Sequence, residues 1–206
     1  MTRPPLRPWP RRAALLLPLL AAACGPDAPV PEARTSFPPL RYDHLTRLRL
    51  NVAEVVVEDR SVPAPDGLDA RSPVRPGDAL RAMAGDRLLP GGASGRAVFV
   101  IEEASIVGAR GGLDGTMAVR LEVQAADGRG AGSAGARVGR DRTGAERGES
   151  LRAVLYDLTV QMMDDMNVEF EFQVRRALRE WLQDTATAPA PAPVERRDLG
   201  APPPPS

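Results

Sequence analysis

Residues 151–183 read LRAVLYDLTVQMMDDMNVEFEFQVRRALREWLQ, and apolar side chains recur there every three or four positions. This spacing predicts one amphipathic helix over the whole stretch. The apolar stripe consists of Leu151, Val154, Leu155, Leu158, Met162, Met166, Phe170, Val174, Ala177 and Trp181. Ser150 or Glu149 can begin the helix, and no proline or glycine interrupts it before Gln183. Such a helix measures roughly 50 Å at 1.5 Å per residue.

The length of this helix affects how it can pack. A typical strand of five or six residues spans only about 17–20 Å, so one sheet would cover only part of the helix. We therefore expect either a bend near Asn167 or a partner on the C-terminal half. In the second case Phe170, Val174 and Trp181 are the candidate partner-binding residues, and a homodimer through this helix is one form of the contact.

Two segments earlier in the chain have the periodicity of strands. Residues 48–57 alternate apolar and polar side chains but change phase near residues 53–54. The change indicates either a β-bulge or a stretch that is buried on both faces. Residues 96–107 contain an uninterrupted apolar block at 97–101. Such a block is typical of a central strand that is covered on both sides.

A hairpin is predicted between residues 117 and 138. Residues 117–125 alternate cleanly between apolar and polar side chains, and Asp127-Gly128 is a typical hairpin turn. The returning strand would direct Ala134, Ala136 and Val138 inward. Because these side chains are small, a helix could pack closely against them.

A shorter helix is predicted over residues 78–89, after Pro76-Gly77-Asp78 and before Pro90. Together the elements predict an α+β domain. We expect a mostly antiparallel four-stranded sheet, packed on one face by two helices, of which the C-terminal one (151–183) is long.

Prolines mark the borders of this domain. Of the 22 prolines, only five lie within residues 42–184, whereas the rest lie near the two ends. We expect a single domain at 42–184, a Pro-rich tether at 24–41 and a disordered Ala/Pro-rich tail at 185–206. Residues 1–23 form a segment of a different kind.

Residues 1–12 carry four arginines and no acid, and an apolar run at 13–23 precedes Cys24. This order is typical of a secretory signal peptide, and the run is shorter than the about 20 residues of a membrane span. Ala21-Ala22-Ala23-Cys24 resembles the lipobox of bacterial prolipoproteins. The resemblance implies that Cys24 is lipidated and becomes the mature N-terminus. Because Gly25 follows rather than Asp, it also implies the periplasmic face of the outer membrane. The alternatives for Cys24, the only cysteine, are a small buried side chain or a leftover thiol.

The charge balance restricts the partners. The chain has 27 arginines, no lysine and 27 acids, so its formal charge is zero. Without residues 1–23 it keeps 23 arginines and 27 acids, a charge of −4. This balance argues against a phosphate-binding surface and a nucleic-acid partner, which need a concentrated basic patch. It also means that the lipid on Cys24, rather than charge, would hold the protein at an anionic membrane.

Few residues offer catalytic or metal chemistry. His44 is the only histidine, and no triad partner accompanies it. Asp164, Asp165, Glu169 and Glu171 are predicted to form a solvated helix face that pairs with Arg175 and Arg176. The glycine-rich stretches at 91–95 and 108–115 lack the residues of a phosphate-binding loop. We therefore expect no enzymatic activity, no metal and no cofactor.

The order of strand, helix (78–89), strand, hairpin and long helix behind a lipobox is similar to that of ABC-type transport auxiliary lipoproteins. The resemblance implies a non-catalytic subunit that docks on a transporter or another envelope protein. We therefore predict a lipid-anchored periplasmic accessory or scaffold of an envelope transport or assembly system. The alternative is a periplasmic carrier that binds a lipid or other apolar ligand between sheet and helices.

Overall fold

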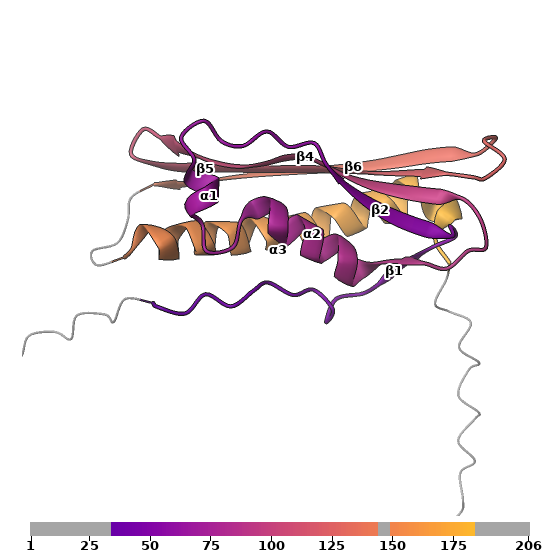
Figure 1. Cartoon of the computed structure of the whole chain (residues 1–206), viewed down its shortest axis with the longest axis horizontal. Helices are drawn as coiled ribbons and strands as arrows, with labels where there is room; N and C mark the ends of the chain where they lie inside the picture. Colours follow the sequence, from indigo (N-terminus) through magenta and orange to yellow (C-terminus); the bar gives the residue numbers. More distant parts are fainter. Residues whose placement is uncertain (1–33, 144–148, 184–206) are drawn as a thin grey trace, which may run out of the picture. The chain divides into compact units, whose positions relative to one another are not determined.

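Four strands form the main sheet of the computed structural model, which describes residues 34–143 and 149–183 (Figure 1). Their order across the sheet is β2 (Glu54–Asp59), β4 (Arg96–Ala109), β5 (Gly112–Gln124) and β6 (Ala131–Thr143). β4, β5 and β6 pair antiparallel, as predicted, but β2 pairs parallel with β4. The sheet is therefore mixed, because the chain passes from β2 through helix α2 (Pro76–Arg87) and re-enters the sheet in the same direction.

The strand predicted over residues 48–57 is two strands in two sheets. β1 (Leu48–Leu50) pairs parallel with β3 (Leu88–Pro90), and β2 begins at Glu54. The change of phase marks the passage from one sheet to the other, so the predicted bulge near residues 53–54 is wrong. The register of the β4–β5 ladder shifts instead between Ile101 and Glu103 of β4.

Helix α3 (Leu151–Ala177) packs with α2 on one face of the main sheet, and the short helix α1 (Leu68–Arg71) contacts both α3 and β4 (Figure 1). The Ser150 hydroxyl caps α3 by accepting a hydrogen bond from the Ala153 amide at 3.2 Å. The predicted apolar stripe is confirmed, because its side chains from Val154 to Val174 are buried against the sheet. The core thus forms between one helix face and one sheet face.

The predicted continuation of this helix to Gln183 is wrong. α3 ends at Ala177, and the 3-10 turn η1 (Arg179–Trp181) follows. The chain then runs beside β1, where the Asn51 amide donates to the Trp181 carbonyl at 2.7 Å and the Gln183 amide donates to the Arg49 carbonyl at 2.9 Å. These tertiary hydrogen bonds replace the ones that further helical turns would make.

The sheet is long enough for the helix. β4 has 14 residues, and β5 and β6 have 13 each. At about 3.3 Å per residue these strands span roughly 45 Å. α3 has 27 residues and measures about 40 Å at 1.5 Å per residue. The expectation of an overhanging helix is therefore wrong, because it assumed strands of average length.

Part of the predicted tether packs on the domain. The Phe37 ring lies 5.3 Å from the Tyr156 ring, and the Tyr156 hydroxyl donates to the Pro38 carbonyl at 3.0 Å. Arg34 forms an ion pair with Asp157. From residue 34 onward the arm thus lies along α3. The rest of the predicted tether, the leader and the predicted tail at 185–206 lie outside the described residues.

Candidate functional site

The face of the sheet opposite the helices carries exposed charged side chains. Three ion pairs join neighbouring residues on it: Arg96 with Glu54 (3.2 Å), Arg120 with Glu102 (2.5 Å) and Arg137 with Glu103 (2.7 Å). Exposed pairs of this kind contribute only about 0–1 kcal/mol to stability. Their main effect is to make this face a mosaic of both charges, open to solvent or to a partner.

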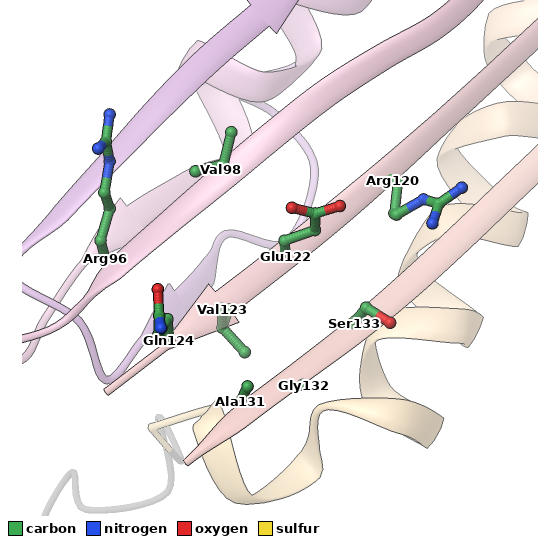
Figure 2. A pocket seen from close by; sticks show the side chains of 9 residues that line it. All are labelled: Arg96, Val98, Arg120, Glu122, Val123, Gln124, Ala131, Gly132 and Ser133. Atoms are coloured by element: carbon green, nitrogen blue, oxygen red, sulfur yellow. The ribbon is translucent and has the colours of Figure 1, made fainter. Parts of the chain in front are cut away.

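This face holds a cavity of about 460 Å³ between β4, β5 and β6. Figure 2 shows that its side chains come from these adjacent strands, among them Arg96, Arg120, Glu122, Gln124 and Ser133. Ser133 supplies the only hydroxyl of the lining, and no histidine or cysteine lies beside it. The cavity can form ion pairs and hydrogen bonds, but it contains no activated nucleophile.

β6 forms one edge of the sheet, and within residues 34–143 and 149–183 no strand pairs with its outer side. The hydrogen bond from the Ala125 amide to the Gly130 carbonyl (2.9 Å) sets the phase of the β5–β6 ladder. Because bonded pairs alternate in an antiparallel ladder, the amides of Ser133, Gly135 and Arg137 point away from β5. A long edge strand with free main-chain groups is a template for adding another strand.

The predicted partner-binding residues lie inside the domain. Phe170 and Val174 are completely buried and belong to the core, and Trp181 is partly buried against it. Trp181 lies beside β6, where its indole nitrogen would be 3.2 Å from a Cβ built on Gly132. Phe170 and Val174 are thus corrected to core residues, since the sheet covers the helix over this length. A homodimer through α3 stays a prediction.

The predicted lipidation site, Cys24, lies outside the described residues. In the part of the chain that the structure describes, no helix combines the length and the hydropathy that a membrane crossing requires. The anchor at Cys24 therefore stays a prediction from the leader sequence.

His44 is exposed and lines a second cavity, of about 370 Å³, between the N-terminal arm and α3. Asp164 and Asn167 of α3 line the same cavity, but His44 has no hydrogen bond to a carboxylate or a hydroxyl among the described residues. The structure therefore brings together no triad around this histidine.

Two of the four acids of the predicted cluster on α3, Asp165 and Glu171, form ion pairs. Asp165 accepts hydrogen bonds from Arg140 at 2.6 and 3.0 Å, and this contact holds the pKa of Asp165 below its usual range. Glu171 accepts from Arg175 at 2.8 Å, which confirms one predicted pair, whereas Arg176 forms no ion pair within the described segments. Among those residues no three acidic, histidine or cysteine side chains are grouped as a metal site would require.

Tyr42 was not among the functional residues predicted from the sequence. Its ring is buried beside the second cavity, and its hydroxyl has no hydrogen-bond partner among the described residues. Burial raises the pKa of Tyr42, and the negative charge of Asp164 raises it further. The phenol is therefore neutral throughout the physiological range, and its only sequence signal was an aromatic residue at the end of the Pro-rich arm.

Arg87 is a second residue whose role was not predicted from the sequence. It is a cation buried inside the core. Its guanidinium donates to the Thr46 carbonyl at 3.2 Å, to the Asn167 side-chain oxygen at 3.0 Å and to Glu171. These bonds join the start of β1, α2 and α3. Arg87 therefore acts as a structural cross-link rather than as part of a reactive site.

Comparisons with known proteins add little to this description. No family model and no curated protein matches the chain. Protein XCC0632 from Xanthomonas campestris, of the family model DUF330, is similar at 10% identity over 69% of this chain and 88% of its own, with a TM-score of 0.35. The PelC dodecamer from Paraburkholderia phytofirmans is similar at 19% identity over 64% of this chain and 94% of its own, with a TM-score of 0.23. Both TM-scores are below 0.5, so neither likeness enters the functional argument.

Proposed function

We propose that the protein is a lipid-anchored, non-catalytic accessory of the bacterial envelope, which works by binding another protein through the edge of β6. The anchor is the acyl-modified Cys24 that the lipobox predicts. Two or more acyl chains give stable membrane attachment, whereas one gives only marginal binding. The predicted place is the periplasmic face of the outer membrane.

The observation that carries the proposal is the open edge of β6, which is 13 residues long. An incoming strand would pair with the outward-pointing main-chain groups of Ser133, Gly135 and Arg137, which no other strand of the described residues contacts. The side chains on β6 are mostly small and would not obstruct its approach. The charged face beside this edge, including the cavity of Figure 2, can then select the partner by its side chains.

The alternative function, an apolar ligand held between sheet and helices, has less support. That layer is filled by large side chains with no exposed surface, including Phe99, Met117, Leu121, Met162 and Phe170. Protein interiors of this kind leave no space for an acyl chain without opening the core. The cavities described above lie on the surface instead.

Replacing Ser133 by proline tests the role of this edge. Because the Ser133 amide points outward, proline removes no hydrogen bond to β5, but it blocks strand addition at the edge. A photoreactive amino acid at position 141 of β6 would capture the partner in intact cells. We expect Ser133→Pro to lower the cross-linking yield about tenfold, since it removes a main-chain hydrogen bond and adds a steric clash.

Ser133→Ala is the matched control, because it changes the same side chain and keeps the amide. It should cross-link like the wild type, and both variants should retain the wild-type circular dichroism. Equal yields from two folded variants would refute binding through the β6 edge. The absence of any adduct in the wild type would refute it as well.

A further inference from the structure

Arginines from three segments surround a cavity of about 500 Å³ at the end of the domain where α3 and β1 meet. Arg47 and Arg49 lie on either side of Leu48, Arg175 and Arg176 lie in the last turn of α3, and Arg179 lies in η1. The hydrogen bonds from Asn51 to Trp181 and from Gln183 to Arg49 fix these segments relative to one another. The arginine pocket, as we call this cavity and its five arginines, is thus placed by the backbone.

Among the described residues, four of the five guanidinium groups have no carboxylate partner. Arg175 contacts Glu171 at 2.8 Å, but Glu171 is shared with the buried Arg87. Arg47, Arg49, Arg176 and Arg179 form no ion pair within residues 34–143 and 149–183. Many other arginines of the domain do form ion pairs with acids: Arg34, Arg41, Arg60, Arg81, Arg96, Arg120, Arg137, Arg140 and Arg142. Within the described part of the chain, the arginine pocket therefore concentrates positive charge that ion pairs do not compensate.

The helix dipole explains only part of this cluster. Cations near the C-terminus of a helix are stabilised by its partial negative charge, which accounts for Arg175 and Arg176. Arg47 and Arg49 belong to another segment, more than a hundred residues away in the sequence, and are not part of any helix. Their like charges repel those of α3, and an anion bound between them would offset this repulsion.

The chemistry of the lining indicates the class of anion. A guanidinium binds phosphate or carboxylate through two parallel hydrogen bonds. A carboxylate carries one charge, whereas a phosphate monoester carries about −1.5 to −2 at neutral pH and offers three acceptor oxygens. A cavity lined by five arginines therefore matches a phosphate better. We propose that the arginine pocket binds a phosphate-bearing ligand, either a lipid headgroup or a soluble phosphate compound.

This inference goes beyond the proposed function and is independent of it, since the arginine pocket does not include β6. It departs from the expectation that a neutral chain has no phosphate-binding surface. Net charge averages over the whole sequence, whereas the fold gathers Arg47 and Arg49 with the arginines of the C-terminal segment.

Isothermal titration of the chain as isolated from cells, in a neutral detergent at fixed ionic strength, tests the proposal. The probes are inorganic pyrophosphate, citrate as a carboxylate anion, and detergent micelles doped with phosphatidic acid or with phosphatidylcholine. We expect saturable binding of pyrophosphate, of phosphatidic acid or of both. Pyrophosphate alone would indicate a soluble ligand, and tighter binding of phosphatidic acid would indicate a lipid headgroup.

Two double variants, Arg47→Gln with Arg179→Gln and Arg49→Gln with Arg176→Gln, should each weaken the binding about tenfold or more, because each removes two charged donors. The control is Arg71→Gln with Arg110→Gln, which removes the same charge at two exposed arginines outside the pocket and should bind like the wild type. Equal affinities of pocket and control variants would overturn the proposal. So would binding of citrate alone, or of no probe.

Discussion

Replacing Phe170 by alanine should lower the free energy of unfolding by about 3–5 kcal/mol, the usual cost of removing a buried aromatic side chain. Phe170 has no exposed surface, and its ring meets the ring of Phe99 edge-on, with centroids 5.5 Å apart and planes at 89°. The substitution removes this contact and leaves a cavity where α3 meets β4. Urea unfolding of the whole chain, followed by circular dichroism, measures the loss.

Phe172 offers a matched control on the same helix. Its side chain is 56% exposed, so Phe172→Ala should change the free energy of unfolding by no more than about 0.5 kcal/mol. Equal destabilisation by the two variants would contradict the placement of the core. The two residues also differ in whether a partner protein could contact them on α3, because the side chain of Phe172 is accessible and that of Phe170 is not.

Replacing Arg87 by methionine should destabilise the fold by about 3 kcal/mol, since it removes one partner of a buried polar network. The methionine fills much of the same space, but the Thr46 carbonyl, the Asn167 side chain and one oxygen of Glu171 lose their donor. Arg81, also on α2, pairs with Asp59 and Asp78 but is half exposed. Arg81→Met should therefore cost less than about 1 kcal/mol in the same unfolding assay.

The network also predicts a dependence on pH. Burial raises the pKa of Glu171, but hydrogen bonds from Arg175 and Arg87 outweigh it and leave the pKa below its usual range. A lowered pKa stabilises the fold above the unfolded value, about 4.3, and that stabilisation is lost as the pH falls through the folded value. The difference in stability between wild type and Arg87→Met should therefore shrink below about pH 4. A difference that stays constant from pH 7 to pH 3 would show that Glu171 contributes nothing.

Local periodicity predicted the elements whose burial is regular. The steps of three and four residues gave the buried face of α3, because one side of that helix lies on the sheet along its length. The alternation at 117–125 and the Asp127-Gly128 turn gave the hairpin of β5 and β6. Gly128 adopts φ +69°, and the Asp127 carboxylate accepts a hydrogen bond from the Arg129 amide. These features depend on neighbours in the sequence, so the sequence alone can report them.

Features that depend on distant contacts were missed. Nothing local ends α3 at Ala177, because the competing hydrogen bonds come from residues 49–51. The parallel pairing of β2 with β4 follows from the crossover through α2. The length of β4 and β5 follows from their pairing with each other. Arg87 did have a signal: it lies three and four residues after Ala84 and Met83, on the apolar face of α2. A cation at such a position indicates a buried partner in a distant element.

The candidate functional features likewise divide into those that a local sequence motif predicts and those that depend on distant contacts. The leader and the lipidation of Cys24 are predictions from the sequence alone, which signal peptides allow because they are linear motifs, and both lie outside the described residues. The open edge of β6 and the arginine pocket arise only from the tertiary fold, which sets the strand order and joins β1 to the C-terminal segment. Neither surface has a signature in the spacing of its residues.

Metabolic labelling of intact cells with a palmitate analogue, comparing wild type with Cys24→Ala, tests the lipid anchor most directly. We expect the wild type to carry the label and to sediment with membranes, and the variant to be unlabelled and released. An unlabelled wild-type protein whose mature sequence begins after Cys24, recovered free of membranes, would contradict the proposed role.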